Sequence, residues 1–154
     1  MPHTRREVIA RAIREFKLLD RRVAKLTPAQ WKAQLVRGET KDPWTVKDAL
    51  AHITHWKWRV ALSARGEPTP AEERHLNITD GNRLVYKRWR NRSPHQVMAW
   101  HRLVQKDLLA ALRAAPTEWF TRRGRARDWP FDVDHHSAAH RLKDIEVALQ
   151  RRVK

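Results

Sequence analysis

The amino-acid sequence predicts an all-α protein, a four-helix bundle with short extra helices in its connections. Glycine is rare, with 4 residues among 154, and four long stretches carry apolar side chains at the three- and four-residue spacing of an amphipathic helix. No stretch shows the alternation typical of a convincing strand. Because this length is about that of one domain, we expect residues 1–154 to form a single bundle domain.

The first long helix is predicted over about residues 4–25. Thr4 and Glu7 have the spacing of a capping box, in which the two side chains bond to backbone N–H groups at the start of a helix. A second cap occurs in "TPAQ", which begins at Thr27 and puts proline at the first helical position. It predicts a short helix that stops near Gly38.

The second long helix is predicted from Thr45 to near Gly66, with Asp48 three residues after the cap to bond back to it. The proline-containing connection "EPTPAEERHLN" follows. It is longer than a bundle usually needs, and such loops often border functional sites. A shorter helix is then expected to begin at Asp80 and to run through "GNRLVYKRWR".

The third long helix is capped by Ser93, which a proline follows, and stops before Pro116. Residues 116–132 mix aromatic side chains with the run "RRGRAR", which predicts an irregular crossover held by aromatic anchors. The last helix is expected to begin near Asp132 or Asp134 and to reach the C-terminus.

The composition excludes several kinds of site. The chain has no cysteine, so a metal would need histidine, carboxylate or water ligands. No window approaches the ~18 apolar residues of a membrane span, and the N-terminus is charged throughout, so we expect a soluble, cytoplasmic protein with no membrane partner. The net charge of +16 suggests attraction to polyanions. Because arginines are spread along every predicted helix, binding to nucleic acid is expected to be non-specific.

Two histidines, His136 and His140, lie four residues apart in the last predicted helix and therefore project from one face. They are either two ligands of a metal site or surface residues of a basic helix. The second long helix offers a third ligand. A rotation of ~100° per residue puts His52 at the edge of its apolar stripe and His55 almost opposite to that stripe, so His52 is the better candidate.

Three neutral imidazoles would leave at least one position on the metal for water or substrate, as in catalytic rather than structural sites. Zinc fits this ligand set, and so do nickel and iron. Asp48, one turn before His52, could orient an imidazole, or it could serve only as the helix cap. Trp44, Trp56 and Trp58 are close to His52 in sequence and could line a cavity for an apolar ligand.

The apolar pattern of the last helix opposes this arrangement. Its most regular stripe joins Ala138, Leu142, Ile145 and Leu149, and the two histidines lie more than ~100° from the centre of that stripe. Either this helix is buried on two sides or the histidines face outward. If the site exists, the stripe should pack on a dimer partner or on the aromatic crossover.

Three segments carry a resemblance to a known family: "DPWTVKDALAHITHW" at residues 42–56, "GNRLVYKRWR", and "DHHSAAHRLKDIE". The first is similar to the second-helix signature of the DinB-like superfamily, in particular of its ClbS/DfsB branch, where a W-[ST]-V-K-D-x-x-A-H run is typical. The other two resemble later motifs of that branch, in the same order and at similar spacing. The resemblance extends from Ile9 to Leu149.

The resemblance implies an up-down-down-up four-helix bundle, often a homodimer, with a histidine triad from the second and last helices. In this chain the triad falls on His52, His136 and His140. Asn82 and Tyr86 fall on the N-x-x-x-Y pattern of the middle helix. They are therefore expected to line the same cavity, or else simply to cap and pack that helix.

The family's activities include metal-dependent thiol transfer and isomerisation and, in the ClbS/DfsB branch, hydrolytic protection against a cyclopropane-bearing genotoxin. The resemblance thus implies a metal-dependent hydrolase or thiol transferase that acts on an electrophilic small molecule, with a divalent metal and a thiol cosubstrate. Two alternatives compete with it. One is a basic module that binds nucleic acid through stretches such as "YKRWRNR" and "WFTRRGRARDW". The other is a non-catalytic bundle that sequesters a small ligand.

Overall fold

The computed structural model describes residues 3–36, 41–121 and 133–151. Within these ranges the regular elements are helical apart from one isolated bridge between Gln34 and Thr45, so the predicted all-α class is confirmed. The elements are α1 (Arg5–Val23), α2 (Pro28–Trp31), α3 (Val46–Ala64), α4 (Ile78–Trp89), α5 (Pro94–Ala114), α6 (Thr117–Thr121), α7 (His135–His140), a π-helical turn (Arg141–Ile145) and α8 (Glu146–Arg151).

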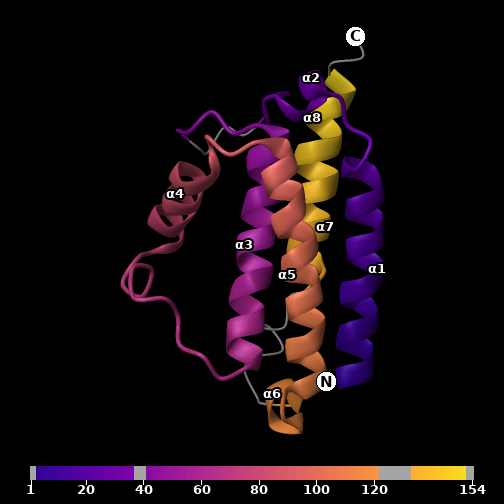
Figure 1. Ribbon diagram of the computed structural model, residues 1–154, viewed down its shortest axis with the longest axis vertical. Coiled ribbons are helices and arrows are strands. Elements are labelled where there is room, and N and C mark those ends of the chain that lie inside the picture. Colours follow the sequence, from indigo (N-terminus) through magenta and orange to yellow (C-terminus); the bar gives the residue numbers. More distant parts are fainter. Residues whose placement is uncertain (1–2, 37–40, 122–132, 152–154) are drawn as a thin grey trace.

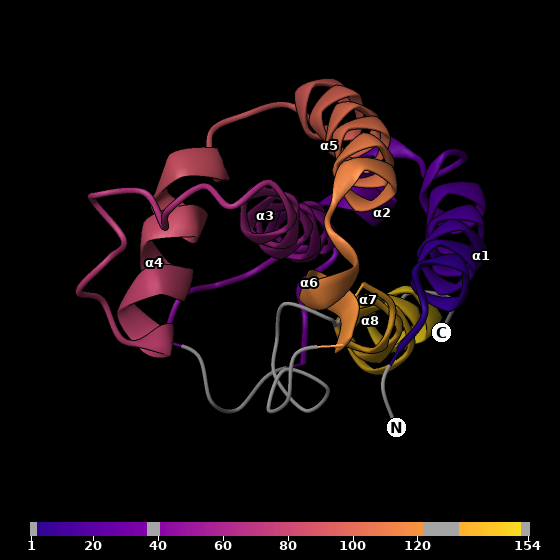
Figure 2. The same cartoon turned by 90° about the horizontal axis from the view of Figure 1, so that it is seen from below.

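The long helices α1, α3 and α5 stand side by side with the last helix, which α7, the π-helical turn and α8 form together (Figure 1). In that view α1 and the last helix run upward, whereas α3 and α5 run downward. Figure 2 shows α4 outside this group, beside α3. Consequently α3 lies between α4 and the rest of the bundle, and side chains on several of its faces are covered.

Local capping places the starts of the long helices where the sequence predicts them. Thr4 and Ser93 form complete capping boxes with the residues three positions on. Thr45 does the same at α3, where its backbone N–H donates to Asp48 Oδ2 at 2.8 Å. At the far end of α3, Gly66 has a φ of 72°, a left-handed conformation that favours glycine after a helix.

Two predicted helix boundaries are wrong, and the predicted crossover holds a short helix. The short helix α2 ends at Trp31 rather than near Gly38. The residues after it form backbone hydrogen bonds to a later segment instead of continuing the helix: the Leu35 N–H, for example, donates to the Trp44 carbonyl at 2.9 Å. Helix α4 begins before Asp80, since the Asn77 side chain caps it. The predicted irregular crossover contains α6, and residues 122–132 lie outside the described part of the chain.

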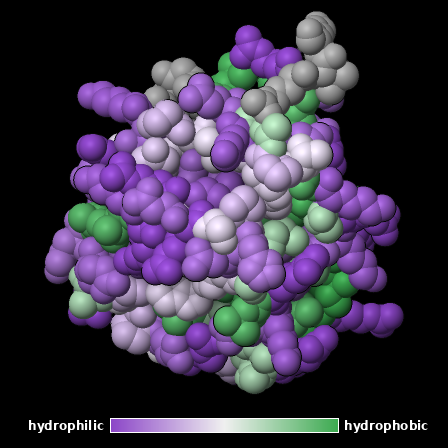
Figure 3. All heavy atoms as spheres, turned by 45° about the horizontal axis from the view of Figure 1, so that its top comes forward, coloured by the Kyte–Doolittle hydropathy of each residue, from purple (hydrophilic) through white to green (hydrophobic). Residues whose placement is uncertain are grey.

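Apolar side chains from all four long helices form the core. One cluster is built around Val60 and Leu108, and another around Leu50 and Ile145. On the outside, one face is mostly hydrophilic with small separate hydrophobic areas (Figure 3), as expected from a net charge of +16. Among the described residues, no helix is both long and apolar enough to cross a membrane.

A lysine is also buried inside the bundle. Lys57 of α3 lies with its Nζ 3.5 Å from Gln105 Oε1 and 5.4 Å from the centre of the Phe16 ring. Burial lowers the pKa of Lys57 to about 8, although the carboxylates of Glu15 and Asp20 on α1 raise it in part. The protonated ammonium is therefore destabilised in the fold relative to the unfolded chain.

This burial predicts a pH-dependent effect of Lys57→Met. The folded pKa lies below the unfolded value of 10.5, so the wild type gains stability as pH rises from about 8 to 10.5. A shift of this size corresponds to about 3 kcal/mol. We expect Lys57→Met to be the more stable protein at pH 7, and its advantage to shrink by about that amount at pH 10.5. Urea unfolding of both proteins at pH 7 and pH 10.5 measures the difference in their free energies of unfolding. A difference that is the same at both pH values would contradict the lowered pKa of Lys57.

A π-helical turn explains the apolar pattern of the last helix. The turn holds one residue more than an α-helical turn, so it rotates the residues beyond it by ~100°. The predicted stripe is therefore wrong at Leu142, which is 54% exposed, while Ile145 and Leu149 are buried. This rotation lets the end of the helix pack into the core while His136 and His140 face α3.

Candidate metal centre

The structure brings together the three predicted histidines. His52 comes from the middle of α3, and His136 and His140 come from successive turns of α7. His136 Nε2 lies 3.1 Å from His52 Nε2 and 3.2 Å from His140 Nε2. One ring nitrogen from each residue lies within 4.8 Å of the other two, so the three could hold one metal ion.

The spacing of these nitrogens fits a metal better than it fits hydrogen bonds alone. An imidazole nitrogen carries either one hydrogen or one lone pair, so His136 Nε2 cannot satisfy two close nitrogen neighbours equally. Nitrogens that share a zinc ion at ~2.1 Å are about 3.0 to 3.4 Å apart. Both measured separations, 3.1 and 3.2 Å, fall in that range. The residues present therefore fit a divalent cation.

Asp144 fixes the orientation of one ligand. Its Oδ2 lies 2.6 Å from His140 Nδ1, so the Nδ1–H donates to the carboxylate and the Nε2 lone pair is directed toward the other histidines. Asp144 belongs to the π-helical turn. The irregular turn thus serves both the packing of the helix end and the geometry of the site.

We expect Asp144→Asn to weaken zinc binding by about 10- to 100-fold, because a neutral amide oxygen accepts the hydrogen bond from His140 Nδ1 less strongly and orients the ring less firmly. Competition with a fluorescent zinc chelator would measure the change. Asp107→Asn is the matched control, because Asp107 lies on α5 and pairs with Arg65. An Asp144→Asn protein that binds zinc like this control would show that the hydrogen bond does not support the site.

The histidines form one wall of a cavity of about 610 Å³, a size typical of small-molecule sites. Trp56 and Asn82 line it too, and Trp56 Nε1 donates to Asn82 Oδ1 at 3.2 Å. Both of these predicted residues therefore lie at the same cavity as the three histidines. The other wall comes mainly from the connection before α4 and the start of α4. Its residues are Arg59, Thr69, Glu73, Arg74, Leu76, Asn77, Ile78 and Gly81.

Two other predicted residues lie elsewhere. Asp48 and Tyr86 line a second, neighbouring cavity and not that of the histidines. Asp48 Oδ2 accepts from Thr45, so it acts as the helix cap. Tyr86 stacks on Trp44 with ring centres 6.3 Å apart, and the Trp44 ring lies 5.0 Å from that of His52. Trp44 thus separates Tyr86 from the histidines.

His55 does not point outward as the helical phase predicts; it is buried. Its Nε2 lies 2.7 Å from Glu73 Oε1, and burial lowers the pKa of His55 to about 4, so the ring is neutral and donates to Glu73. Arg59 Nη1 donates to the same oxygen at 3.1 Å. Glu73 was not predicted as a site residue, although the connection that carries it was expected to border a site.

Comparison with known proteins places this architecture in a family. Residues 7–142 match the family model of the DinB superfamily. The chain belongs to the DinB superfamily. Members of the superfamily often bind metal, which accords with the three convergent histidines.

A solved structure is also similar to this DinB superfamily protein. It is the crystal structure of an uncharacterised protein from Escherichia coli UTI89, with a TM-score of 0.64 and 12% sequence identity. The likeness covers 99% of this chain and 91% of that one. At this identity it shows a shared fold and nothing about activity. A comparison with curated proteins finds no match.

Proposed function

We propose that this protein is a metal-dependent enzyme in which His52, His136 and His140 hold a divalent cation, and that it acts on an electrophilic small molecule by hydrolysis or thiol transfer. The convergence of three Nε2 atoms on one wall of a cavity carries this proposal. Three protein ligands leave coordination positions open, as in catalytic sites. Zinc, nickel and iron all accept imidazole ligands.

When bound, such a cation is a Lewis acid that makes water or a thiol a better nucleophile near neutral pH. The chain's own residues would bind and orient the substrate. Trp56, Leu76 and Ile78 bring apolar surface to the cavity, which can take an apolar substrate body. The amide group of Asn82, whose oxygen accepts from Trp56, can donate to a polar group of the substrate.

Arg59 supports the same proposal, because its guanidinium is held in a fixed position at the cavity. It donates to Glu73 Oε1 at 3.1 Å and to Thr69 Oγ1 at 3.0 Å, and it lies 5.5 Å from the centre of the Trp56 ring. A guanidinium fixed in this way can orient a carbonyl or carboxylate of the substrate.

Metal analysis of protein purified without an affinity tag tests the proposal. We expect one equivalent of a transition metal per chain, or uptake of one equivalent of added zinc or nickel. The loaded protein should then convert an electrophile such as an epoxide, and mass spectrometry separates addition of water from addition of a thiol. A chain that neither contains nor takes up metal would overturn the proposal. Tight binding of the electrophile without turnover would favour sequestration.

We further propose that the chain belongs to the ClbS/DfsB branch. The run "WTVKDALAH" at residues 44–52 supports this assignment.

We also propose that the chain forms a homodimer. The last helix exposes two apolar side chains, Leu142 and Val147. A second copy of the chain packed against them would bury both. Sedimentation equilibrium tests the dimer, and a single species of 18.3 kDa at micromolar concentration would contradict it.

A further inference from the structure

A second cavity, of about 730 Å³, lies where α2, the start of α3, the end of α4 and the start of α5 meet. It shares no lining residue with the histidine cavity. Its lining combines aromatic, cationic and carboxylate side chains with three prolines. The residues are Leu26, Pro28, Trp31, Lys32, Pro43, Thr45, Lys47, Asp48, Tyr86, Arg90, Asn91, Arg92 and Pro94.

Lys47 fixes the shape of this cavity. Its Nζ donates to the backbone carbonyls of Trp89, Arg90 and Arg92 at 3.1, 2.6 and 2.7 Å. An ammonium has three hydrogens, so all of them are used on the segment that links α4 to α5. Lys47 therefore holds this segment against α3. Its ammonium has no hydrogen left for a ligand, so a ligand's negative charge would have to pair with other residues.

Asp48 brings a hydrogen-bond acceptor to the same cavity. The residue is only 6% exposed, and its Oδ2 accepts from the backbone and the side chain of Thr45. Its Oδ1 is buried without a hydrogen-bond partner among the described residues, with Lys47 Nζ 4.0 Å away. An unsatisfied buried carboxylate oxygen is unfavourable, so a ligand that brings an N–H group would stabilise this wall.

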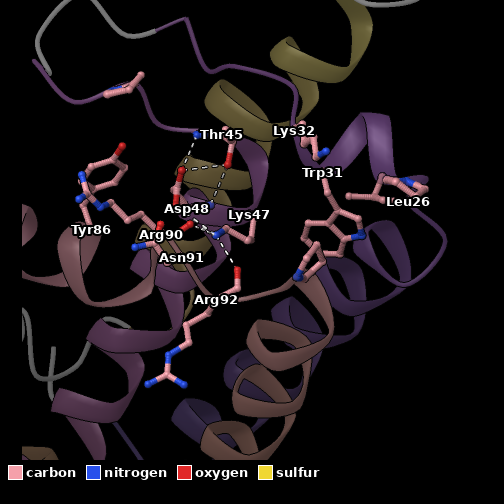
Figure 4. Close-up of a pocket in the computed structure, with 13 residues that line it drawn as sticks. Leu26, Trp31, Lys32, Thr45, Lys47, Asp48, Tyr86, Arg90, Asn91 and Arg92 are labelled. Carbon is pink, nitrogen blue, oxygen red and sulfur yellow. Dashed lines mark hydrogen bonds and ion pairs between the residues drawn. The ribbon is translucent and has the colours of Figure 1, made fainter.

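Aromatic surfaces and cations complete the lining. Figure 4 shows Trp31 and Tyr86 on opposite sides of Thr45, Lys47 and Asp48. Lys32 is exposed next to Trp31, and Arg90 is exposed as well, with a charge that partly offsets the raised pKa of the Tyr86 hydroxyl. The cavity thus offers flat apolar surface inside and positive charge at its edge.

We propose that this second cavity binds a planar heteroaromatic anion of the nucleoside monophosphate type. The ring would lie against Trp31 or Tyr86, an N–H group of the base would approach Asp48, and the phosphate would pair with Arg90 and Lys32. A purely apolar ligand would leave the carboxylate and the cations unused. A bare inorganic anion would leave the aromatic surfaces unused. The volume suits a single nucleotide.

Calorimetric titration with GMP tests this proposal, with a chelator present so that phosphate cannot bind through a metal. We expect saturable binding with one site per chain, and weaker binding of both guanosine and ribose 5-phosphate, since each lacks one half of the recognised chemistry. His136→Ala should bind GMP like the wild type, because the two cavities are separate. The result is thus independent of the proposed enzyme activity.

Two variants and a matched control locate the binding. Arg90→Gln and Tyr86→Leu should each weaken GMP binding by about tenfold. Arg83→Gln removes the same charge from α4 outside both cavities and should leave binding unchanged. Absence of GMP binding, equal binding of ribose 5-phosphate, or equal losses in Arg83→Gln and Arg90→Gln would each overturn the proposal. Tighter binding of a short oligonucleotide that is also weakened by Arg83→Gln would show that general charge attraction is responsible.

Discussion

His136→Ala will lower zinc affinity by more than about a hundredfold, whereas His135→Ala will leave it unchanged. His136 Nε2 is the atom that lies next to both other ligands, at 3.1 and 3.2 Å. Its removal leaves two imidazoles, which do not satisfy the three-ligand requirement of a catalytic zinc site. Isothermal titration of both variants with zinc, after treatment with a chelator, measures the change.

His135 is a matched control for His136. The side chain of His135 is 81% exposed, so the two variants remove the same chemical group from adjacent positions of one helix. Circular dichroism should give the same helix content for both. If His135→Ala lost as much zinc affinity as His136→Ala, the zinc would be bound by surface histidines of a basic helix. Because both variants keep the helix content, comparing their turnover also separates loss of the site from general loss of structure.

The helix starts could be predicted because capping is local. Thr4, Thr45 and Ser93 each bond to the residue three positions on, and both members of such a pair are visible in the sequence. The end of α2 could not be predicted in the same way. It depends on backbone bonds to residues beyond the following loop, such as that between Val46 and Ala33.

The three convergent histidines were predictable only in part from helical phase. The pair His136 and His140 follows from a spacing of four, and the phase of α3 favoured His52. The same argument failed for His55. The connection that carries Glu73 covers this residue, and the path of a connection cannot be read from the periodicity of the helix that precedes it.

The π-helical turn is the feature that periodicity could not predict. An ideal helix from His136 onward would put Leu142 with Ile145 and Leu149, yet only the last two are buried. The conflict between histidines and apolar stripe was itself a signal, because one inserted residue resolves it. The spacing of His140 and Asp144, four residues apart, could also have indicated a ligand with its carboxylate partner.

A partly buried ion pair joins α1 to the helix that carries the two histidines, and breaking it will destabilise the fold. Glu15 Oε1 and Oε2 accept from Arg141 at 2.8 and 2.9 Å, and Ser137 Oγ donates to Oε1 at 3.3 Å. Glu15 also lowers the energy of the protonated Lys57. Glu15→Gln keeps the shape but removes the charge, so Arg141 loses its carboxylate partner and Lys57 retains only the carboxylate of Asp20. We expect a loss of about 3 to 5 kcal/mol in the free energy of unfolding.

A second substitution shows whether charge is responsible. If the loss comes from the uncompensated ammonium, then Lys57→Met added to Glu15→Gln should recover a large part of it, because the double variant no longer buries that cation. Residues that share one electrostatic network give such non-additive effects, of about 0.5 to 3 kcal/mol. Urea unfolding of the wild type, both single variants and the double variant completes the cycle at pH 7. Additive effects would mean that Glu15 acts only through Arg141 and Ser137, as a clamp on the last helix next to the histidines.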